Sequence, residues 1–309
     1  MIKLHKGFFD ILALALLWGP SYLFIKIAES DIAPLTLVAV RVSLGVLLLY
    51  AVSQLRRISI WDSVRKHQKL WMHCFVIGFF ATGLPFACFN YAILYIPTSL
   101  TALITGTTPI VTIILANLFL KDERLTWNRA IGVLVGLSGF CVLFLPSVLS
   151  ALLGTDMDLD IKGILLSFIA ASSYAVGMVY ARKNIVKAPP LVAPILQLSS
   201  SLTYLIPLAF IFESPIPMLQ AASTSSWLAV GGLAVLGTML AFVVYYRIVA
   251  MQGATALSTV TYLLPVFSTI LGMVFLKETV GLQFCVAAGL ILCGVLIING
   301  KFVRERELR

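Results

Sequence analysis

The stretch ALLWGPSYLFIKIAE, residues 15–29, is the most informative part of the sequence. It is apolar enough to enter a bilayer, yet a Gly-Pro pair breaks it in the middle. Trp18, Tyr22 and Lys26 recur in it at intervals of four, and residues four apart share one face of a helix. Facing lipid, a row of two aromatic rings and a cation would be unfavourable at depth. Facing a cavity, the same row supplies flat surfaces for a ligand to stack on, so we expect a cavity beside it.

The composition assigns the chain to the membrane. Hydrophobic residues make up 60% of the 309 residues and charged residues 11%, whereas soluble domains carry about 25% charged residues. So few charges cannot cover so much apolar surface in water, and we predict a multi-pass membrane protein. The formal charge of +9 comes from bases dispersed among apolar runs, so no nucleic-acid partner is expected.

The reactive side chains form no recognisable catalytic or metal-binding motif. The five cysteines lie in or beside apolar runs without a C-x-x-C pair, which indicates small core residues rather than disulfides or metal ligands. The three histidines, His5, His67 and His73, fall near one expected face of the membrane, and no H-E-x-x-H, G-x-S-x-G or phosphate-loop motif occurs. We therefore expect no enzyme, no metal and no cofactor.

Ten apolar segments approach the length of about 20 residues that a membrane-spanning helix needs. They are residues 8–28, 32–54, 70–94, 98–120, 127–149, 161–181, 190–212, 226–246, 254–276 and 280–300. The first follows a basic start, as a signal peptide does. Its apolar run is longer than the roughly 7–15 residues of a signal core, and no A-x-A-like site follows it. We expect it to be retained as a helix.

Basic residues predict the orientation. With the N-terminus in the cytoplasm, the cytoplasmic segments hold 18 Lys and Arg residues and the outer segments hold 3. This is the asymmetry that the positive-inside rule describes, and nine or eleven spans would destroy it. We therefore predict ten spans with both termini in the cytoplasm.

The two halves of the chain match at an offset of 156 residues. The matched pairs include Trp18 with Tyr174, Arg41 with Gln197, and Pro109 with Pro265. Because each half holds five spans, the second half crosses the membrane in the opposite sense, which makes an inverted-topology repeat. Such repeats are typical of transporters, whose substrate sites lie near the midplane between the repeats. A duplicated scaffold without a transport role is the alternative.

The segments LLWGPSYLFIK and TGTTPIVTIILANLFLKDERLT, with the spacing of Pro34 and Arg41, resemble the EamA family of the drug/metabolite transporter superfamily. The resemblance covers essentially the whole chain. It implies an all-α integral membrane fold of ten transmembrane helices, built as two inverted-topology five-helix repeats around a central cavity. It also implies export of metabolites or amino acids across a bacterial inner membrane, without naming the substrate. The expected parts are a first repeat at 1–150, a second repeat at 155–300 and a basic cytoplasmic tail at 301–309.

Aromatic residues of both halves are candidates for the cavity wall. Trp18 lies about ten residues into its span, about 15 Å deep at about 1.5 Å per residue, which is too deep for an interfacial aromatic belt. Tyr22 follows one turn later, and Tyr174 is the equivalent of Trp18 in the second half. We expect these side chains to line the cavity, with packing between helices as the alternative. Lys26 and Arg182, at the ends of the two rows, are expected to be bases outside the site.

Pro109 and Pro265 lie near the middles of the fourth and ninth spans. Proline cannot donate to the carbonyl four residues earlier, and these carbonyls belong to Thr105 and Thr261. Backbone freed in this way is tolerated where polar neighbours or a water-filled cavity satisfy it. The sequence therefore predicts hinges with threonine groups that bind substrate, or else static kinks that the threonine hydroxyls satisfy.

Arg41 is the one ionisable residue near the centre of a predicted span, where an unpaired charge is costly. It either neutralises an anionic group of the substrate or ties helix carbonyls together. Its match to neutral Gln197 indicates that the fold does not need the charge twice. Further candidates for the cavity are Asn90, Gln197, Tyr245 and Tyr262.

Acidic residues are confined to span ends and loops. Because a proton-coupled exporter of cationic drugs normally keeps a buried carboxylate, this distribution disfavours a multidrug exporter. Glu123 precedes the fifth span and is expected to cap that helix, whose first turn favours a carboxylate. Gly132 and Gly136 form a G-x-x-x-G step that allows close helix approach, either inside the bundle or at a homodimer face.

These patterns predict a transporter that exports a small amphipathic metabolite, such as an amino acid, by alternating access. Aromatic rings, threonine hydroxyls and one guanidinium suit a molecule with an apolar body and a carboxylate. The expected partners are this small molecule and the lipid bilayer, and the protein is expected to be a monomer or a homodimer. A membrane-embedded enzyme and a non-transporting scaffold are the alternatives, and solute flux into liposomes distinguishes them.

Overall fold

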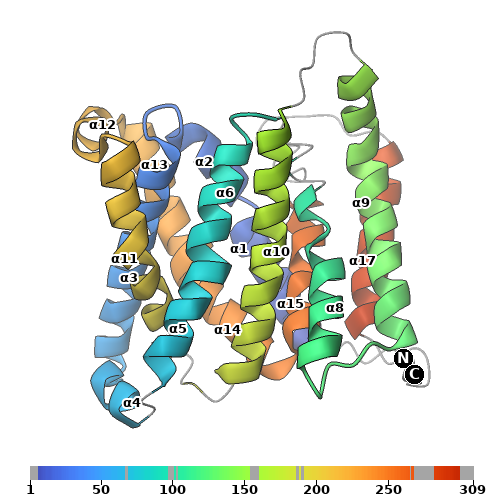
Figure 1. The fold of residues 1–309 in the computed structure, drawn as a ribbon, viewed down its shortest axis with the longest axis horizontal. Coiled ribbons are helices and arrows are strands. Elements are labelled where there is room, and N and C mark those ends of the chain that lie inside the picture. The colour runs from blue at the N-terminus through green and yellow to red at the C-terminus, as the bar shows by residue number, and fades with distance from the viewer. Residues whose placement is uncertain are drawn as a thin grey trace.

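The computed structural model describes residues 6–66, 69–96, 101, 104–153, 160–185, 188, 191–264, 266–267 and 282–299. Every element in this part of the chain is a helix (Figure 1). The first half contains α1 (Lys6–Trp18), α2 (Ser21–Ala28), α3 (Pro34–Leu55), α4 (Ile60–Lys66), α5 (Leu70–Gly78), η1 (Phe79–Gly83), α6 (Leu84–Ala92), α8 (Thr108–Phe119) and α9 (Trp127–Leu153). The second half contains α10 (Ile161–Asn184), α11 (Val192–Phe212), α12 (Pro215–Ala221), α13 (Thr224–Gly232), η2 (Leu233–Leu240), α14 (Ala241–Met251), α15 (Ala254–Ser258) and α17 (Leu282–Asn299). Pro265 and the predicted tail at 301–309 lie outside the described residues.

Several helices are long and apolar enough to cross a membrane. Among the described residues these are Gly7–Ala28, Pro34–Leu55, Leu70–Ala92, Ile161–Asn184, Val192–Phe212 and Thr224–Met251. Shorter apolar helices occupy Thr108–Phe119, Trp127–Val142, Ala254–Leu264 and Leu282–Ile298. Each of these helices overlaps one of the segments that the hydropathy pattern predicts. The described part of the chain is therefore all helical, and the protein is a multi-pass membrane protein.

Two of the long spans change to a π-helix part of the way along. The element η1 follows α5 directly, and η2 follows α13 directly. The offset of 156 residues places η1 inside η2, so both halves carry the irregularity at the same position. Because π-helices are rare and frequently mark functional sites, this position in each half is a place to look for ligand contacts.

Helices of the two halves pack on one another. The helix α3 packs against α11, α9 against α17, α1 against α14, and α10 against both α6 and α8. Figure 1 shows α9 and α17 side by side at one edge of the bundle. One hydrophobic core joins Leu14 and Val38 of the first half to Leu198 and Leu257 of the second, so the halves share their core.

Glycines let α9 and α17 approach closely. A Cβ built on Gly294 would lie 2.5 Å from the backbone nitrogen of Gly136 and 2.7 Å from the carbonyl oxygen of Gly132, which leaves no room for a side chain. Small residues at such positions are typical of close helix packing in membranes. The predicted G-x-x-x-G step is therefore an internal contact with α17.

Candidate functional site

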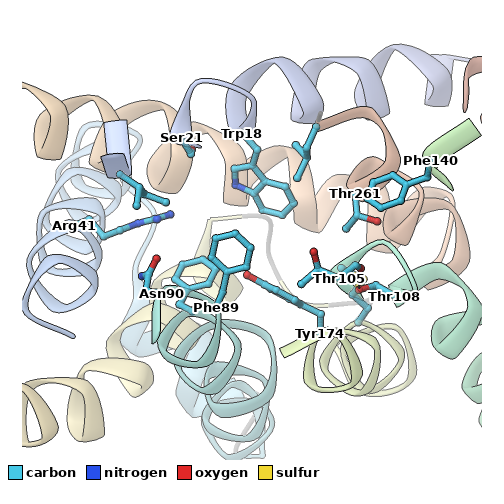
Figure 2. A pocket seen from close by; sticks show the side chains of 14 residues that line it. Trp18, Ser21, Arg41, Phe89, Asn90, Thr105, Thr108, Phe140, Tyr174 and Thr261 are labelled. Carbon is cyan, nitrogen blue, oxygen red and sulfur yellow. Dashed lines mark hydrogen bonds between the residues drawn. The ribbon is translucent and has the colours of Figure 1, made fainter. Parts of the chain in front are cut away.

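A cavity lies between the two halves, beside the break that separates α1 from α2. The cavity has a volume of about 110 Å³, whereas a single water molecule needs about 10–15 Å³ on the same measure. Figure 2 shows aromatic rings in its middle and polar side chains on two sides. One polar side carries Ser21, Arg41 and Asn90, and the other carries Thr105, Thr108 and Thr261.

Trp18 is the last residue of α1, because the Gly-Pro pair that follows interrupts the helix. Its indole Nε1 donates a hydrogen bond of 3.0 Å to the carbonyl oxygen of Gly237 in η2. The ring also packs against Phe242 and Tyr245 of α14 while it lines the cavity. Cavity lining and packing, which the sequence left as alternatives, therefore both apply to Trp18.

The rest of the aromatic row divides between cavity and surface. Tyr174 of α10 lines the cavity opposite Trp18 (Figure 2), as the offset between the halves predicts. Lys26 is exposed, as expected for a base outside the site. The side chain of Tyr22 lies outside the part of the structure that is described.

Arg41 lies on α3 with only 4% of its surface exposed. Its guanidinium carbon is 4.6 Å from the centre of the Phe86 ring, a cation–π contact, and Figure 2 shows the guanidinium pointing into the cavity. In the described part of the chain its Nε has no hydrogen-bond partner. The sequence left open a second role, in which the guanidinium donates to helix carbonyls. Nε makes no such hydrogen bond within the described residues.

The threonine side of the cavity presents acceptors. The hydroxyl of Thr108 donates to the carbonyl oxygen of Thr105 at 2.6 Å, and the hydroxyl of Thr261 donates to that of Ser258 at 2.8 Å. A hydroxyl has one hydrogen and two lone pairs, so these two offer lone pairs to a ligand. The cavity is thus polarised, with the guanidinium on one side and hydroxyl acceptors on the other.

The fourth span differs from its prediction at Pro109. The sequence placed this proline inside a helix, but α8 begins at Thr108 after a turn at Gly106 and Thr107. Pro109 therefore lies in a first turn, where its missing N–H has no intrahelical partner to lose. The carbonyl of Thr105 accepts from the Thr108 hydroxyl, whereas the static interpretation assigned this role to the hydroxyl of Thr105, which donates to the carbonyl oxygen of Thr101 instead. A hinge at Pro109 remains a prediction.

Two polar residues complete the side of the cavity around Arg41. Asn90, a predicted candidate, lies on α6 with 2% of its surface exposed and lines the cavity. Ser21 is the first residue of α2 and also lines the cavity, although the sequence pattern did not identify it. Its position three residues after Trp18 was the available signal, because residues three apart share a helix face.

Three predicted residues lie behind the cavity wall. The Gln197 amide donates to the Thr82 hydroxyl at 2.7 Å and accepts a hydrogen bond from the Tyr246 hydroxyl. The Tyr262 hydroxyl donates to the carbonyl oxygen of Val133 at 3.4 Å, and Tyr245 packs behind Trp18. All three are buried but do not line the cavity. Sequence depth alone could not separate residues on the wall from those one layer behind it.

Glu123 caps a different helix from the one expected. It is 1% exposed and accepts hydrogen bonds from the backbone N–H groups of Ala254 at 2.7 Å and Thr255 at 2.9 Å. These groups belong to α15, whereas its own chain continues into α9. The first N–H groups of a helix lack intrahelical partners, and the loop before α9 brings the carboxylate to those of α15.

Arg182 makes its contacts at the same end of the bundle. It lies one turn beyond Met178, a residue of the cavity wall. Its Nη1 donates to the carbonyl oxygens of Val249 at 2.8 Å and Ala250 at 2.7 Å. It also pairs with carboxylates of the loop before α9, Asp122 at 2.6 Å and Glu123 at 3.6 Å. Arg182 is therefore a linking residue between α10, α14 and that loop rather than a solvated base.

Comparison with known proteins agrees with this architecture. The model of the EamA-like transporter family matches residues 5–145 and again residues 161–300. An uncharacterized transporter of Bacillus subtilis, YoaV, is 24% identical over 99% of this chain and 100% of its own length. The uncharacterized inner membrane transporter YedA of Escherichia coli is 24% identical over 95% of this chain and 90% of its own. A crystal structure with 21% identity superposes with a TM-score of 0.78 over 96% of this chain and 99% of the other. With two matches that span most of its length, the chain belongs to the EamA-like transporter family, and it is a membrane transporter rather than an enzyme.

Proposed function

We propose that this transporter exports a small amphipathic metabolite, such as an amino acid or a related compound, through the cavity by alternating access. The observation that carries the proposal is a cavity walled by both EamA repeats, with aromatic rings between a guanidinium and a set of hydroxyl acceptors. A molecule with an apolar body and polar groups at its ends complements such a wall. Among the described lining residues none is acidic, which disfavours a bare cation as the substrate.

The proposal includes an inverted pair of five-helix repeats in a bacterial inner membrane, with ten spans and both termini in the cytoplasm. The asymmetry of basic residues supports this orientation, and the relative YedA is described as an inner membrane transporter. A reporter fused after Arg65 is expected to be cytoplasmic and one fused after Thr155 periplasmic. Finding both on the same side would contradict the inverted arrangement.

In this proposal the contacts of Arg182 and Glu123 close the cytoplasmic end of the pathway. Alternating access requires that one end is sealed while the other gives access to the site. The hydrogen bonds from Arg182 to α14 and from α15 to Glu123 would break when the cavity opens to the cytoplasm. Pro109 and Pro265 are proposed as the points where their spans flex.

Flux of candidate metabolites into proteoliposomes tests the proposal directly. Trp18→Ala is expected to weaken binding of a transported aromatic metabolite by about 1–3 kcal/mol, about 5- to 150-fold, because the ring is lost from the wall. Trp71→Ala is the control, since Trp71 is 51% exposed and lies away from the cavity. Equal binding by both variants would contradict a stacking role, and absence of flux for every metabolite would contradict transport through this cavity.

A further inference from the structure

Three buried polar atoms on one side of the cavity have no protein partner in the described part of the chain. They are Oγ of Ser21, Nε of Arg41 and Oδ1 of Asn90, and the three residues are 9%, 4% and 2% exposed. The large majority of buried side-chain polar atoms in proteins have a hydrogen-bond partner. Three exceptions at one place, on three different helices, are therefore unusual.

The side chains of Ser21 and Arg41 both lie beside Gly237, a residue without a side chain. A Cβ built on Gly237 would lie 2.7 Å from Oγ of Ser21 and 3.7 Å from Nη2 of Arg41. Both side chains thus use the space that this glycine of η2 leaves open. Figure 2 shows Arg41 reaching into the cavity between Ser21 and Asn90, with its guanidinium held against the Phe86 ring.

At the equivalent position in the second repeat, the side chains pack directly together and the polar groups are hydrogen-bonded. The two family matches begin 156 residues apart, and this offset pairs Arg41 with Gln197, Ser21 with Gly177, and Gly237 with Ala81. The Gln197 amide is bonded at both ends, to Thr82 and to Tyr246. A Cβ on Gly177 would lie 2.6 Å from that of Ala81, so the two small residues pack directly together. At the Gln197 position the fold therefore needs no charge, and the amide of Gln197 has a hydrogen-bond partner at each end.

We propose that Ser21, Arg41 and Asn90, here named the Arg41 subsite, bind the carboxylate end of the transported molecule, with Ser21 and Arg41 donating to the carboxylate itself. The inference rests on the proposed transport function and adds the chemical group and its position. A guanidinium and a carboxylate form two parallel charge-assisted hydrogen bonds, and the Ser21 hydroxyl supplies a further donor. The Asn90 carbonyl accepts from an N–H or O–H group next to the carboxylate. One guanidinium balances the single charge of a carboxylate better than the nearly double charge of a phosphate monoester.

The first test needs no substrate. Arg41→Gln, which copies the second repeat, is expected to raise the melting temperature of the purified full chain in detergent, because it removes a buried charge that has no carboxylate partner among the described residues and whose Nε has no hydrogen bond. A guanidinium that supports the fold gives the opposite result, and a fall in melting temperature would overturn the proposal. Gln197→Leu is the matched comparison at the equivalent position and is expected to lower the melting temperature.

The second test compares acids with their amides. The probes are benzoate, 3-phenylpropanoate and phenylalanine with their amides, and phenyl phosphate, each measured for binding and for flux in proteoliposomes. The parent is expected to bind at least one acid about 10- to 100-fold better than its amide, as a hydrogen bond to a charged group contributes. Ser21→Ala, a small change that keeps the fold, is expected to reduce this preference, and Arg41→Gln to abolish it.

Each result of the second test has a defined meaning. Flux of acids and amides at equal rates overturns the subsite and leaves transport standing. Tighter binding of phenyl phosphate than of every acid overturns the assignment to a carboxylate. Binding that prefers the acid, without flux of any probe, supports the subsite and contradicts the proposed transport.

Discussion

The Arg41 subsite and the Gln197 cluster, which consists of Gln197, Thr82 and Tyr246, occupy equivalent places in the two repeats. In the Gln197 cluster every amide and hydroxyl meets another side chain. In the Arg41 subsite three buried polar atoms meet none among the described residues. A satisfied buried network makes the fold rigid, whereas an unsatisfied one destabilises it, as functional sites commonly do. The difference supports the proposal that one repeat uses this position for support and the other for a ligand.

The contacts of Glu123, like those of the Gln197 cluster, leave its carboxylate hydrogen-bonded. Removing this carboxylate is expected to cause the largest loss of stability. Glu123→Ala leaves two N–H groups of α15 without their acceptor and removes the buried one of the two carboxylates that pair with Arg182. Removing one partner from a buried charged pair costs about 3–5 kcal/mol, which thermal unfolding in detergent measures. Asp122→Ala is the control, because Asp122 pairs with the same arginine but its side chain is 57% exposed, and exposed pairs contribute about 0–1 kcal/mol. Equal losses from both variants would contradict the capping role.

The Gln197 cluster is expected to show the next largest effect. Gln197→Leu leaves the hydroxyls of Thr82 and Tyr246 buried without this partner, which costs about 1–3 kcal/mol of unfolding free energy. Arg41→Gln is expected to show no such loss, so the pair of variants measures the contrast between the repeats. If both lower the stability by the same amount, the two positions are alike and the comparison fails.

Gly237 offers a smaller change that separates binding from folding. Gly237→Ala copies Ala81 and places a methyl group 2.7 Å from Oγ of Ser21, so the serine must turn away from the Arg41 subsite. We expect acid binding to fall about 10-fold, the contribution of about one hydrogen bond, while flux of the amide persists. Gly231→Ala is the control in the preceding helix, since nothing lies within 4 Å of its position. Unchanged acid binding in Gly237→Ala would place the carboxylate elsewhere.

The sequence alone predicts the membrane helices and part of the cavity. Hydropathy locates the spans because every backbone group in a bilayer must be satisfied within a helix. The depth of Trp18 and the charge of Arg41 identify side chains that lipid would not tolerate, and both line the cavity. These are local properties that can be read from neighbouring residues.

Other features depend on contacts far apart in the chain. Glu123 caps a helix that begins about 130 residues later, which no local pattern indicates. The π-helices are equally hidden, because an apolar stretch has the same composition in an α-helix and in a π-helix. Ser21 resembles any small residue of a membrane helix until Gly237 is placed beside it.

The smallest expected effect concerns pH and a carboxylate just outside the first span. Glu29 follows α2, and one of its carboxylate oxygens is buried without a partner among the described residues. Burial raises the pKa of Glu29 from its usual 4.5 to about 7. The folded state therefore binds this proton more tightly than the unfolded state, so stability is expected to fall as the pH rises from about 4.5 to about 7. Because the group is partly exposed, we expect a change of about 1 kcal/mol at most.

Glu29→Gln is expected to flatten this part of the pH profile and to raise the melting temperature at pH 8, where the parent holds the buried charge. Asp31, two residues further along, provides the control of opposite sign. Hydrogen bonds from Ser223 and Ser226 lower the pKa of Asp31 to about 2, so it stays ionised from pH 4.5 to pH 8. Asp31→Asn is therefore expected to lower the melting temperature by a constant amount across this range. Glu29 resembles the Arg41 subsite, because neutralising a buried group without partners raises the stability. Asp31 resembles the Gln197 cluster, because removing a group with hydrogen-bond partners lowers the stability. A Glu29→Gln profile that keeps the slope of the parent would show that another group titrates.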